Sequence, residues 1–295
     1  MKYAPIAPLF DLDLAGDFEY SMILAWMANN EIYSTYYKNK HARTITGKDY
    51  HILDNGANEN KMIDGKEYIK IAQNLQVDEI IAPDVYHDAN STLEKTRNFI
   101  RNDYPILEER NVSLMAVPQG ENLKDLLWTF DEFLANPRIN VIGIGYRNIL
   151  SAVLKDLEKM TDQDWIELGF LEPEWLKTKI PIETFNYTLS RLYFMKKYNI
   201  IEDVRKSGKK IHCLGLYNPV EISLYSSFFN SYELETLRSY DSAIPFQAAQ
   251  VYMPFKSYGV KTKPRKYLDM FAPLGKGQRE IAEFNIEKLV RWGVV

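Results

Sequence analysis

Short apolar runs that end in small or polar residues recur along this chain, separated by segments long enough for a helix. Because the runs are nearly continuous instead of alternating with polar residues, they are typical of parallel strands that are buried on both faces. Seven such runs lie at residues 3–8, 50–54, 79–84, 112–119, 140–145, 210–215 and 240–245. They predict a mainly parallel sheet.

The segments between these runs have helical spacing. The clearest apolar stripe falls on one face of a helix and consists of Leu123, Leu126, Leu127, Phe130 and Phe133. Strands that alternate with helices predict the α/β class. Seven expected strands favour a (β/α)8 TIM-type barrel over an open sheet, and we expect the eighth strand after Gly259.

One connection is longer than the others. Residues 146–209 separate the fifth expected strand from the next, and they carry an acidic stretch followed by a strong helical pattern at 181–206. No segment has the composition of a linker between domains. We therefore expect a helical insertion within a single barrel domain that spans residues 1–295.

Composition limits the class of protein. The single cysteine, Cys213, excludes a disulfide framework and a cysteine-based zinc site. The first residues lack the apolar core of a signal peptide, and no segment has the length of a membrane span. A soluble, cytoplasmic protein that makes no membrane contact is expected.

The net charge of −4 means that nucleic-acid binding would depend on local basic patches. Two segments have this character, and each is either a solvated face or a phosphate-binding surface. The first contains Lys38, Lys40, Arg43 and Lys48, and the second contains Lys256, Lys261, Lys263, Arg265 and Lys266.

Polar residues end several of the expected strands. In a barrel such residues point toward the mouth at the C-terminal ends of the strands, where enzymes of this fold keep their active sites. Asp54, Asp84, Gln119 and Asp241 are the candidates. An aspartate at a strand end is often only a helix N-cap, but several carboxylates in one mouth are costly to desolvate unless they bind or react. His51 and His212 lie inside expected strands and are interpreted as packed core residues.

Six short motifs follow one another in a recognisable order. They are Leu53-Asp54-Asn55-Gly56, Pro83-Asp84, Val117-Pro118-Gln119-Gly120, Ile142-Gly143-Ile144-Gly145, Leu214-Gly215-Leu216 and Tyr240-Asp241-Ser242-Ala243-Ile244-Pro245. Each motif is unspecific alone, but together they resemble the tRNA-guanine transglycosylase family. Members of this family exchange guanine for a 7-deazaguanine base.

The resemblance implies a role for each motif. Asp241 would attack C1′ of the sugar and hold a covalent glycosyl intermediate, and Asp54 would act as general base toward the incoming base. Asp84 would accept the N1–H and N2–H donors of guanine. The amide of Gln119 and the backbone near Gly145 would serve O6, with Leu214 and Gly215 against the flat base. The exchange needs no cofactor, because one glycosidic bond replaces another.

The sequence departs from the family in three places. The zinc-binding cysteines are missing, so no metal site is expected. Asn58 stands where the family has an aromatic residue, and Tyr86 or Tyr217 would have to replace it. The arginine-containing segment after the nucleophile is Phe246-Gln247-Ala248-Ala249 here.

A short, zinc-free relative resembles the branch that modifies DNA, including forms encoded by viruses. The implied partners are DNA and a free 7-deazaguanine such as 7-cyano-7-deazaguanine, and a viral member would work in the host cytoplasm. Lys261, Lys263 and Arg265 would contact DNA phosphates. Members of the family often form dimers, so a homodimer stays open.

Three alternatives remain at this stage. The first is a minimal transglycosylase that acts on tRNA. The second is a non-catalytic nucleic-acid-binding partner subunit, and the third is an unrelated barrel enzyme such as an aldolase. Retention of both Asp54 and Asp241 argues against the binding subunit, and no Gly-rich phosphate loop supports the last alternative.

Overall fold

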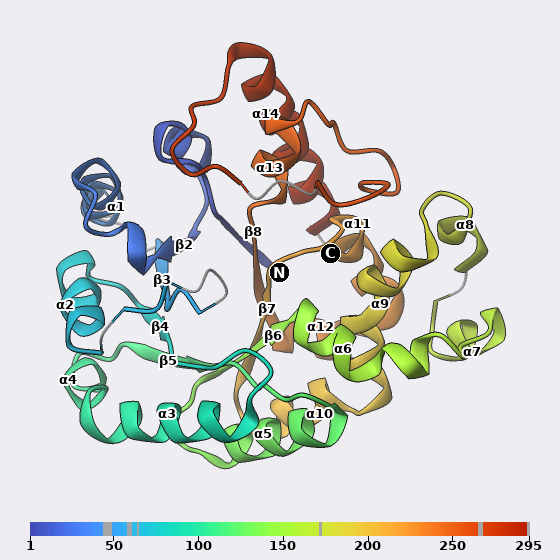
Figure 1. The fold of residues 1–295 in the computed structure, drawn as a ribbon, viewed down its shortest axis with the longest axis horizontal. Helices are drawn as coiled ribbons and strands as arrows, with labels where there is room; N and C mark the ends of the chain where they lie inside the picture. The colour runs from blue at the N-terminus through green and yellow to red at the C-terminus, as the bar shows by residue number, and fades with distance from the viewer. Residues whose placement is uncertain (44–48, 58–60, 64, 171–172, 265–267, 294–295) are drawn as a thin grey trace.

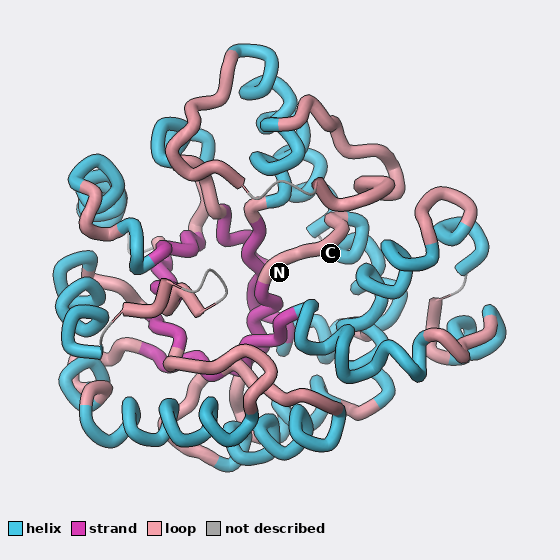
Figure 2. Tube along the Cα trace, in the orientation of Figure 1, coloured by secondary structure: helices cyan, strands magenta, loops and turns pink. Residues whose placement is uncertain are grey.

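The computed structural model describes residues 1–43, 49–57, 61–63, 65–170, 173–264 and 268–293. Parallel strands surround the centre of the molecule, and helices form the outer ring (Figures 1 and 2). The strands are β1 (Lys2–Pro5), β2 (Tyr20–Leu24), β3 (Tyr50–Asp54), β4 (Glu79–Ile81), β5 (Ser113–Ala116), β6 (Val141–Gly145), β7 (Lys210–Leu214) and β8 (Leu237–Ser242). Their order, β1-β8-β7-β6-β5-β4-β3-β2, gives a nearly closed eight-stranded barrel and confirms the predicted fold class.

Side chains bridge the seam between the first and last strands of this order. No backbone ladder joins β1 to β2 in the part of the chain that the structure describes. Lys2 of β1 instead forms an ion pair with Glu19, directly before β2. Tyr3 packs edge-to-face against Phe18, with ring centroids 5.0 Å apart.

The prediction of an eighth strand after Gly259 is wrong. The eighth strand is β2, and beyond Gly259 the described residues contain no strand, only an isolated bridge between Gly259 and Lys256. The apolar run of β2 continues into the 3₁₀ turn Ala25–Met27, so no polar residue marks the end of the strand. The strand was therefore hidden within a longer apolar segment.

Helices cover the outside of the barrel and extend it on one side. They are α1 (Glu31–Arg43), α2 (Gly65–Leu75), α3 (Ala89–Asn102), α4 (Pro105–Glu108), α5 (Leu123–Ala135), α6 (Tyr146–Leu157), α7 (Asp162–Glu167), α8 (Pro173–Lys177), α9 (Ile182–Lys197), α10 (Ile200–Lys206), α11 (Val220–Phe228), α12 (Ser231–Thr236), α13 (Ile244–Gln250) and α14 (Lys276–Gly293). The described part of the chain contains no helix with the length and apolar character needed to cross a membrane.

The expected insertion consists of α6 to α10, between β6 and β7. The short helices α7 and α8 lie outside the ring, whereas α9 returns toward the barrel (Figure 1). The predicted helix at 181–206 is two helices, because Asn199 between them adopts a left-handed conformation with φ of 55°.

Apolar side chains fill the interior of the barrel. The inward-facing core consists of Ala4, Met22, Ile52, Ile81, Met115, Val117 and Val141. A barrel of eight strands is just wide enough for such side chains to fill it, so the interior is packed instead of forming a pore.

A buried ion pair closes the N-terminal end of the barrel. Glu79 begins β4 and is fully buried, and both of its carboxylate oxygens accept hydrogen bonds from Arg238 of β8, at 2.6 and 2.9 Å. The hydroxyl of Tyr50 donates to the same carboxylate at 2.8 Å. These side chains therefore fill the interior of the barrel at its N-terminal end.

His51 of β3 is a buried histidine in the outer layer, as the sequence predicted. The residue is fully buried, and neither ring nitrogen has a hydrogen-bond partner among the described residues. Its ring packs against those of Tyr37 and His41. Burial, together with the charges of Lys40 and His41, lowers the pKa of His51 to about 3.

We expect His51 to make the fold acid-sensitive. Its pKa in the folded state lies below the value of about 6.5 in the unfolded chain, so its contribution to stability is complete above pH 6.5 and is lost as pH falls toward 3. The free energy of unfolding should lose up to about 1.4 kcal/mol per pH unit over this window. Urea unfolding of the wild type and His51→Phe between pH 7.5 and 4 tests this, because the variant should lack that part of the slope. Parallel pH profiles would contradict it.

Candidate active site

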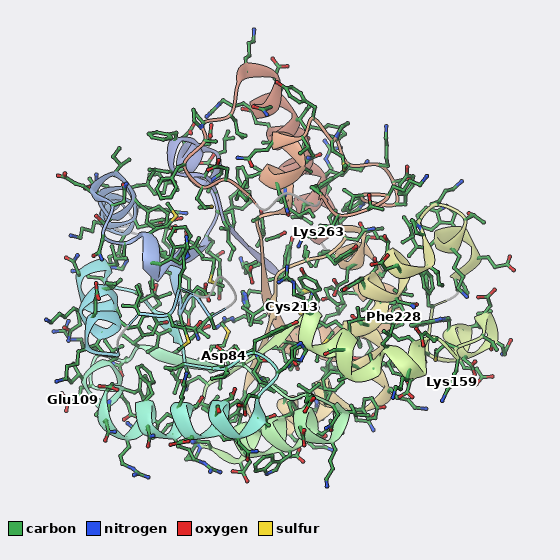
Figure 3. All side chains as sticks on the ribbon, in the orientation of Figure 1. Asp84, Glu109, Lys159, Cys213, Phe228 and Lys263 are labelled. Carbon is green, nitrogen blue, oxygen red and sulfur yellow. The ribbon has the colours of Figure 1, made fainter. Side chains whose placement is uncertain are left out.

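The C-terminal ends of neighbouring strands bring the predicted site residues to one mouth. Asp54 and Gly145 end β3 and β6, and Asp84 and Gln119 follow β4 and β5 by three residues each. Leu214 ends β7, with Gly215 next to it, and Asp241 lies in β8. Asp84 is drawn close to the barrel axis in Figure 3. Hydrogen bonds connect these residues into two groups, one around Asp241 and one around Asp84.

The carboxylate of Asp241 is held through one oxygen only. Oδ1 accepts the backbone N–H of Gly215 at 3.0 Å and lies 3.0 Å from Nε2 of His212. Nδ1 of His212 lies 2.8 Å from the hydroxyl of Ser239. Oδ2 has no hydrogen-bond donor among the described residues, although Asp241 is only 5% exposed. One oxygen is therefore oriented and the other is free in a largely buried position.

The burial of His212 agrees with the prediction of a core residue, but its contact with Asp241 was missed. His212 and Leu214 alternate with Ile211 and Cys213, which pack on the outer face of the sheet. The period of two therefore turns His212 into the barrel. This alternation was the signal in the sequence that could have identified it.

Asp84 is buried with both carboxylate oxygens occupied. Oδ1 accepts from the side-chain amide of Asn55 at 2.8 Å, and Oδ2 accepts from the amide of Gln119 at 2.6 Å. Burial raises the pKa of Asp84, and the two amide donors partly offset that effect. Asn55, which was not singled out from the sequence, also donates to the carbonyl of Ala82 at 2.7 Å and so fixes the loop after β3 to β4.

Two glycines at the mouth differ in what they provide. Gly215 has a φ of 62°, a left-handed conformation that suits glycine and directs its N–H toward Asp241. A Cβ atom at Gly145 would meet no atom within 4 Å, so the backbone at the end of β6 faces open space. Asp54 is half-buried at the end of β3, adjacent to Asn55.

A fully buried arginine from the insertion supports this mouth. Arg191 of α9 donates to the carbonyls of Ile144, Leu214 and Gly215, at 2.8, 3.0 and 2.9 Å. Its Nε and Nη2 also donate to the carboxylate of Glu221, at 2.7 and 3.0 Å. Arg191 thereby joins the ends of β6 and β7, including the residue whose N–H orients Asp241.

A second cationic group lies at the mouth, and the sequence analysis named only Lys263 and Tyr217 of its members. Tyr146, the first residue of α6, accepts hydrogen bonds from Nζ of Lys263 and Nε of Arg147, both at 3.1 Å. Tyr217 stacks on Tyr187 beside it, with ring centroids 4.1 Å apart and planes inclined by 8°. No motif pointed to Tyr146, Arg147 or Tyr187, because the group is assembled from three connections that are distant in the sequence.

The predicted phosphate-binding residues lie in the connection before α14. Lys261 is exposed, whereas Lys263 is half-buried and donates to Tyr146 and to the carbonyl of Leu216. Arg265 lies outside the described residues, as does Asn58. Tyr86 is 46% exposed, and its ring contacts His87.

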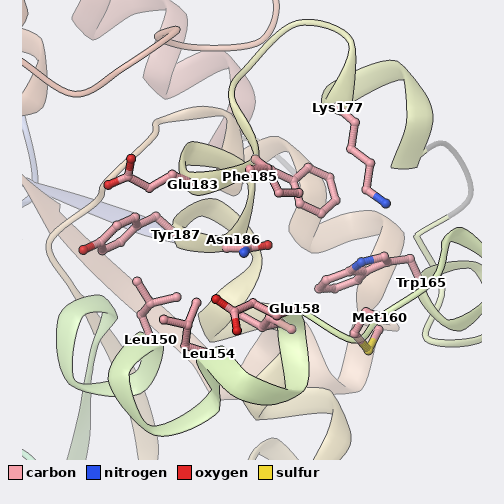
Figure 4. A pocket seen from close by; sticks show the side chains of 12 residues that line it. Leu150, Leu154, Glu158, Met160, Trp165, Lys177, Glu183, Phe185, Asn186 and Tyr187 are labelled. Carbon is pink, nitrogen blue, oxygen red and sulfur yellow. The ribbon is translucent and has the colours of Figure 1, made fainter.

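A cavity of about 380 Å³ lies outside the barrel, between α6 and α9 (Figure 4). Its walls are mainly apolar and include Leu150, Trp165 and Phe185, with the 7%-exposed Asn186 among them. None of the predicted site residues lines it. We therefore place the candidate active site at the barrel mouth, where the carboxylates lie.

Comparisons with known proteins found no match for this chain among family models or curated proteins. Among the described residues, no group of three or more His, Cys, Asp or Glu side chains is placed to hold a metal ion. The geometry of the mouth and the sequence motifs are therefore the features that bear on function.

We expect replacement of Arg191 to destabilise the fold strongly. Arg191→Met leaves Glu221 as an unpaired buried charge and removes the donor to three strand-end carbonyls, which should cost about 3–5 kcal/mol of unfolding free energy. Arg205→Met, which breaks the exposed ion pair with Glu202, is the matched control and should cost far less. Urea unfolding of both variants measures the difference, and equal losses would contradict the role given to Arg191.

Proposed function

We propose that this protein is a base-exchange transglycosylase that replaces guanine in DNA with a 7-deazaguanine, such as 7-cyano-7-deazaguanine. The observation that carries the proposal is that two carboxylates at one mouth differ in their hydrogen bonding. Asp241 has one free oxygen, and Asp84 is buried with two N–H donors on its carboxylate. The first suits a nucleophile and the second suits a group that recognises a base.

The geometry around Asp241 suits covalent catalysis at a sugar carbon. Retention of configuration at C1′ requires a carboxylate that attacks the carbon and is later displaced. His212 and the N–H of Gly215 hold Oδ1, so Oδ2 is the oxygen available to attack. Asp54, at the end of β3, would then remove the proton from the incoming base.

The side-chain amides of Asn55 and Gln119 donate to Asp84 in the way that the edge of a bound guanine would. Guanine and its 7-deaza relatives offer N1–H and N2–H as adjacent donors, and a carboxylate accepts such a pair. In the structure, Asn55 and Gln119 supply two donors to the same oxygens. Binding would exchange these amide donors for the donors of the base, and Gln119 would then be available to O6.

DNA is the proposed substrate because of the resemblance to zinc-free members and because of the basic connection near the mouth. A base in a duplex must be flipped out of the stack to reach a barrel mouth, and contacts to the neighbouring phosphates would hold the strand. Lys261 is exposed in the connection that reaches Tyr146 through Lys263.

Base exchange is tested by incubating the protein with DNA, or separately with tRNA, plus 7-cyano-7-deazaguanine, and by mass spectrometry of the nucleosides. We expect incorporation into DNA, reduced at least about 10³-fold in Asp241→Asn and strongly in Asp54→Asn. Asp88→Asn is the matched control, because Asp88 is an exposed N-cap of α3 and asparagine also caps helices. Its activity should be unchanged.

Two other outcomes would change the proposal. Incorporation only into tRNA would retain the mechanism and replace the substrate. Absence of incorporation into either nucleic acid would refute base exchange and leave the non-catalytic binding subunit as the better interpretation.

We expect Lys261 to contribute to DNA binding through phosphate contact. Lys261→Gln should weaken binding and reduce the slope of log K against log salt by about one. Lys159→Gln is the control, because Lys159 is exposed at the outer edge of the molecule (Figure 3). Fluorescence anisotropy across a salt series measures both, and an unchanged slope for Lys261→Gln would exclude the contact.

A further inference from the structure

Tyr146 lies at the mouth, between the ends of β6 and β7. It directly follows Gly145 at the end of β6, and it is 8% exposed. A Cβ atom at Gly215 would lie 3.3 Å from Cε1 of Tyr146, so the tyrosine ring covers the glycine whose N–H binds Asp241. The ring of Tyr146 thus packs against the residue that binds the proposed nucleophile.

The phenol oxygen carries two cationic donors. Nζ of Lys263 and Nε of Arg147 each donate to it at 3.1 Å. Nζ of Lys263 also lies 4.9 Å from the centre of the Tyr146 ring and donates to the carbonyl of Leu216 at 3.2 Å. Lys263 is therefore held over the phenol by three separate contacts.

The proton of the phenol has no acceptor in the part of the chain that the structure describes. In both hydrogen bonds that the structure gives Tyr146, the hydroxyl oxygen accepts, and the described residues provide no acceptor for its O–H. Burial alone would raise the pKa of Tyr146, but the charges of Lys263 and Arg147 outweigh burial and lower it. The result is a phenol that is more acidic than usual, with a proton to give.

Packing alone does not account for this arrangement. Tyr187 and Tyr217 contact the ring of Tyr146 edge-on, which a phenylalanine would also allow. A hydroxyl that only filled space would not need two cations, and placing them around a largely buried oxygen costs desolvation. Two cations around one oxygen instead stabilise a phenolate.

We propose that Tyr146 is the acid that protonates the departing base, an inference that rests on the proposed base exchange. Oδ2 of Asp241 bonds to C1′ as the C1′–N9 bond breaks, and the electron pair of that bond stays on guanine. The phenol proton passes to the imidazole ring of guanine, which leaves neutral, and the phenolate is stabilised by Lys263 and Arg147. The incoming base loses its N9 proton to Asp54 as N9 displaces Asp241. Asp54 then releases this proton to solvent, and solvent returns a proton to Tyr146, so both groups regain their starting states.

Kinetics of Tyr146→Phe test the role directly. We expect kcat for guanine exchange in DNA to fall about 10²- to 10⁴-fold with KM little changed, because general acid catalysis contributes on this scale. Tyr187→Phe keeps a stacked ring and removes a hydroxyl outside the cation pair, so it should retain near wild-type kcat. Lys263→Met should move the alkaline limb of the pH–rate profile to higher pH.

A substrate that needs no proton distinguishes an acid from a structural residue. DNA carrying 7-methylguanine at the target position already has a positive charge on the imidazole ring. Its base should therefore leave at nearly equal single-turnover rates from wild type and Tyr146→Phe, whereas guanine should not. Equal losses for both bases, or no loss for guanine, would overturn the role.

Titration of the phenol separates this inference from the proposed function. With [13C]tyrosine in the whole protein, the Tyr146 signal is identified by its loss in Tyr146→Phe, and its pKa should lie below 10 and rise in Lys263→Met. An ordinary pKa that does not respond to Lys263→Met would overturn the inference. A lowered pKa without any exchange activity in the wild type would refute base exchange, and Tyr146 would then be an acid for another leaving group.

Discussion

The fully buried pair of Arg191 and Glu221 is the interaction on which the mouth depends. Arg191 arrives from the helical insertion, outside the repeating strand–helix units, yet it satisfies carbonyls at the ends of both β6 and β7. A guanidinium without its carboxylate partner would be far more costly at this depth, so the pair holds only as a unit. The insertion is therefore part of the machinery that shapes the site.

The two ends of the barrel differ in how their charges are used. At the N-terminal end, Arg238 donates to both carboxylate oxygens of Glu79, and a tyrosine hydroxyl adds a further donor. At the C-terminal end, the described residues offer no donor to one oxygen of Asp241 and no acceptor for the hydroxyl proton of Tyr146. Among the described residues, this incomplete pairing at the C-terminal end is what makes the mouth the candidate active site.

Much of the fold could be predicted from the sequence, because seven strands are continuous apolar runs with clear polar ends. β2 was missed because its apolar run continues into a 3₁₀ turn. At the mouth, Asp84 and Asp241 stand in local motifs and were found, whereas Arg191 and Tyr146 act through contacts with segments distant in the sequence. Such contacts leave no local pattern, so sequence reasoning had no signal for them.

The amides on Asp84 have a consequence for selectivity. Because Asn55 and Gln119 already satisfy the carboxylate, a base in the proposed exchange would gain nothing unless it restored both hydrogen bonds that it displaced. Adenine, cytosine and thymine lack two adjacent donors of the guanine type, so their entry would leave an acceptor unmet in a buried place. Under this proposal, discrimination would begin with the hydrogen bonds that the protein makes to itself.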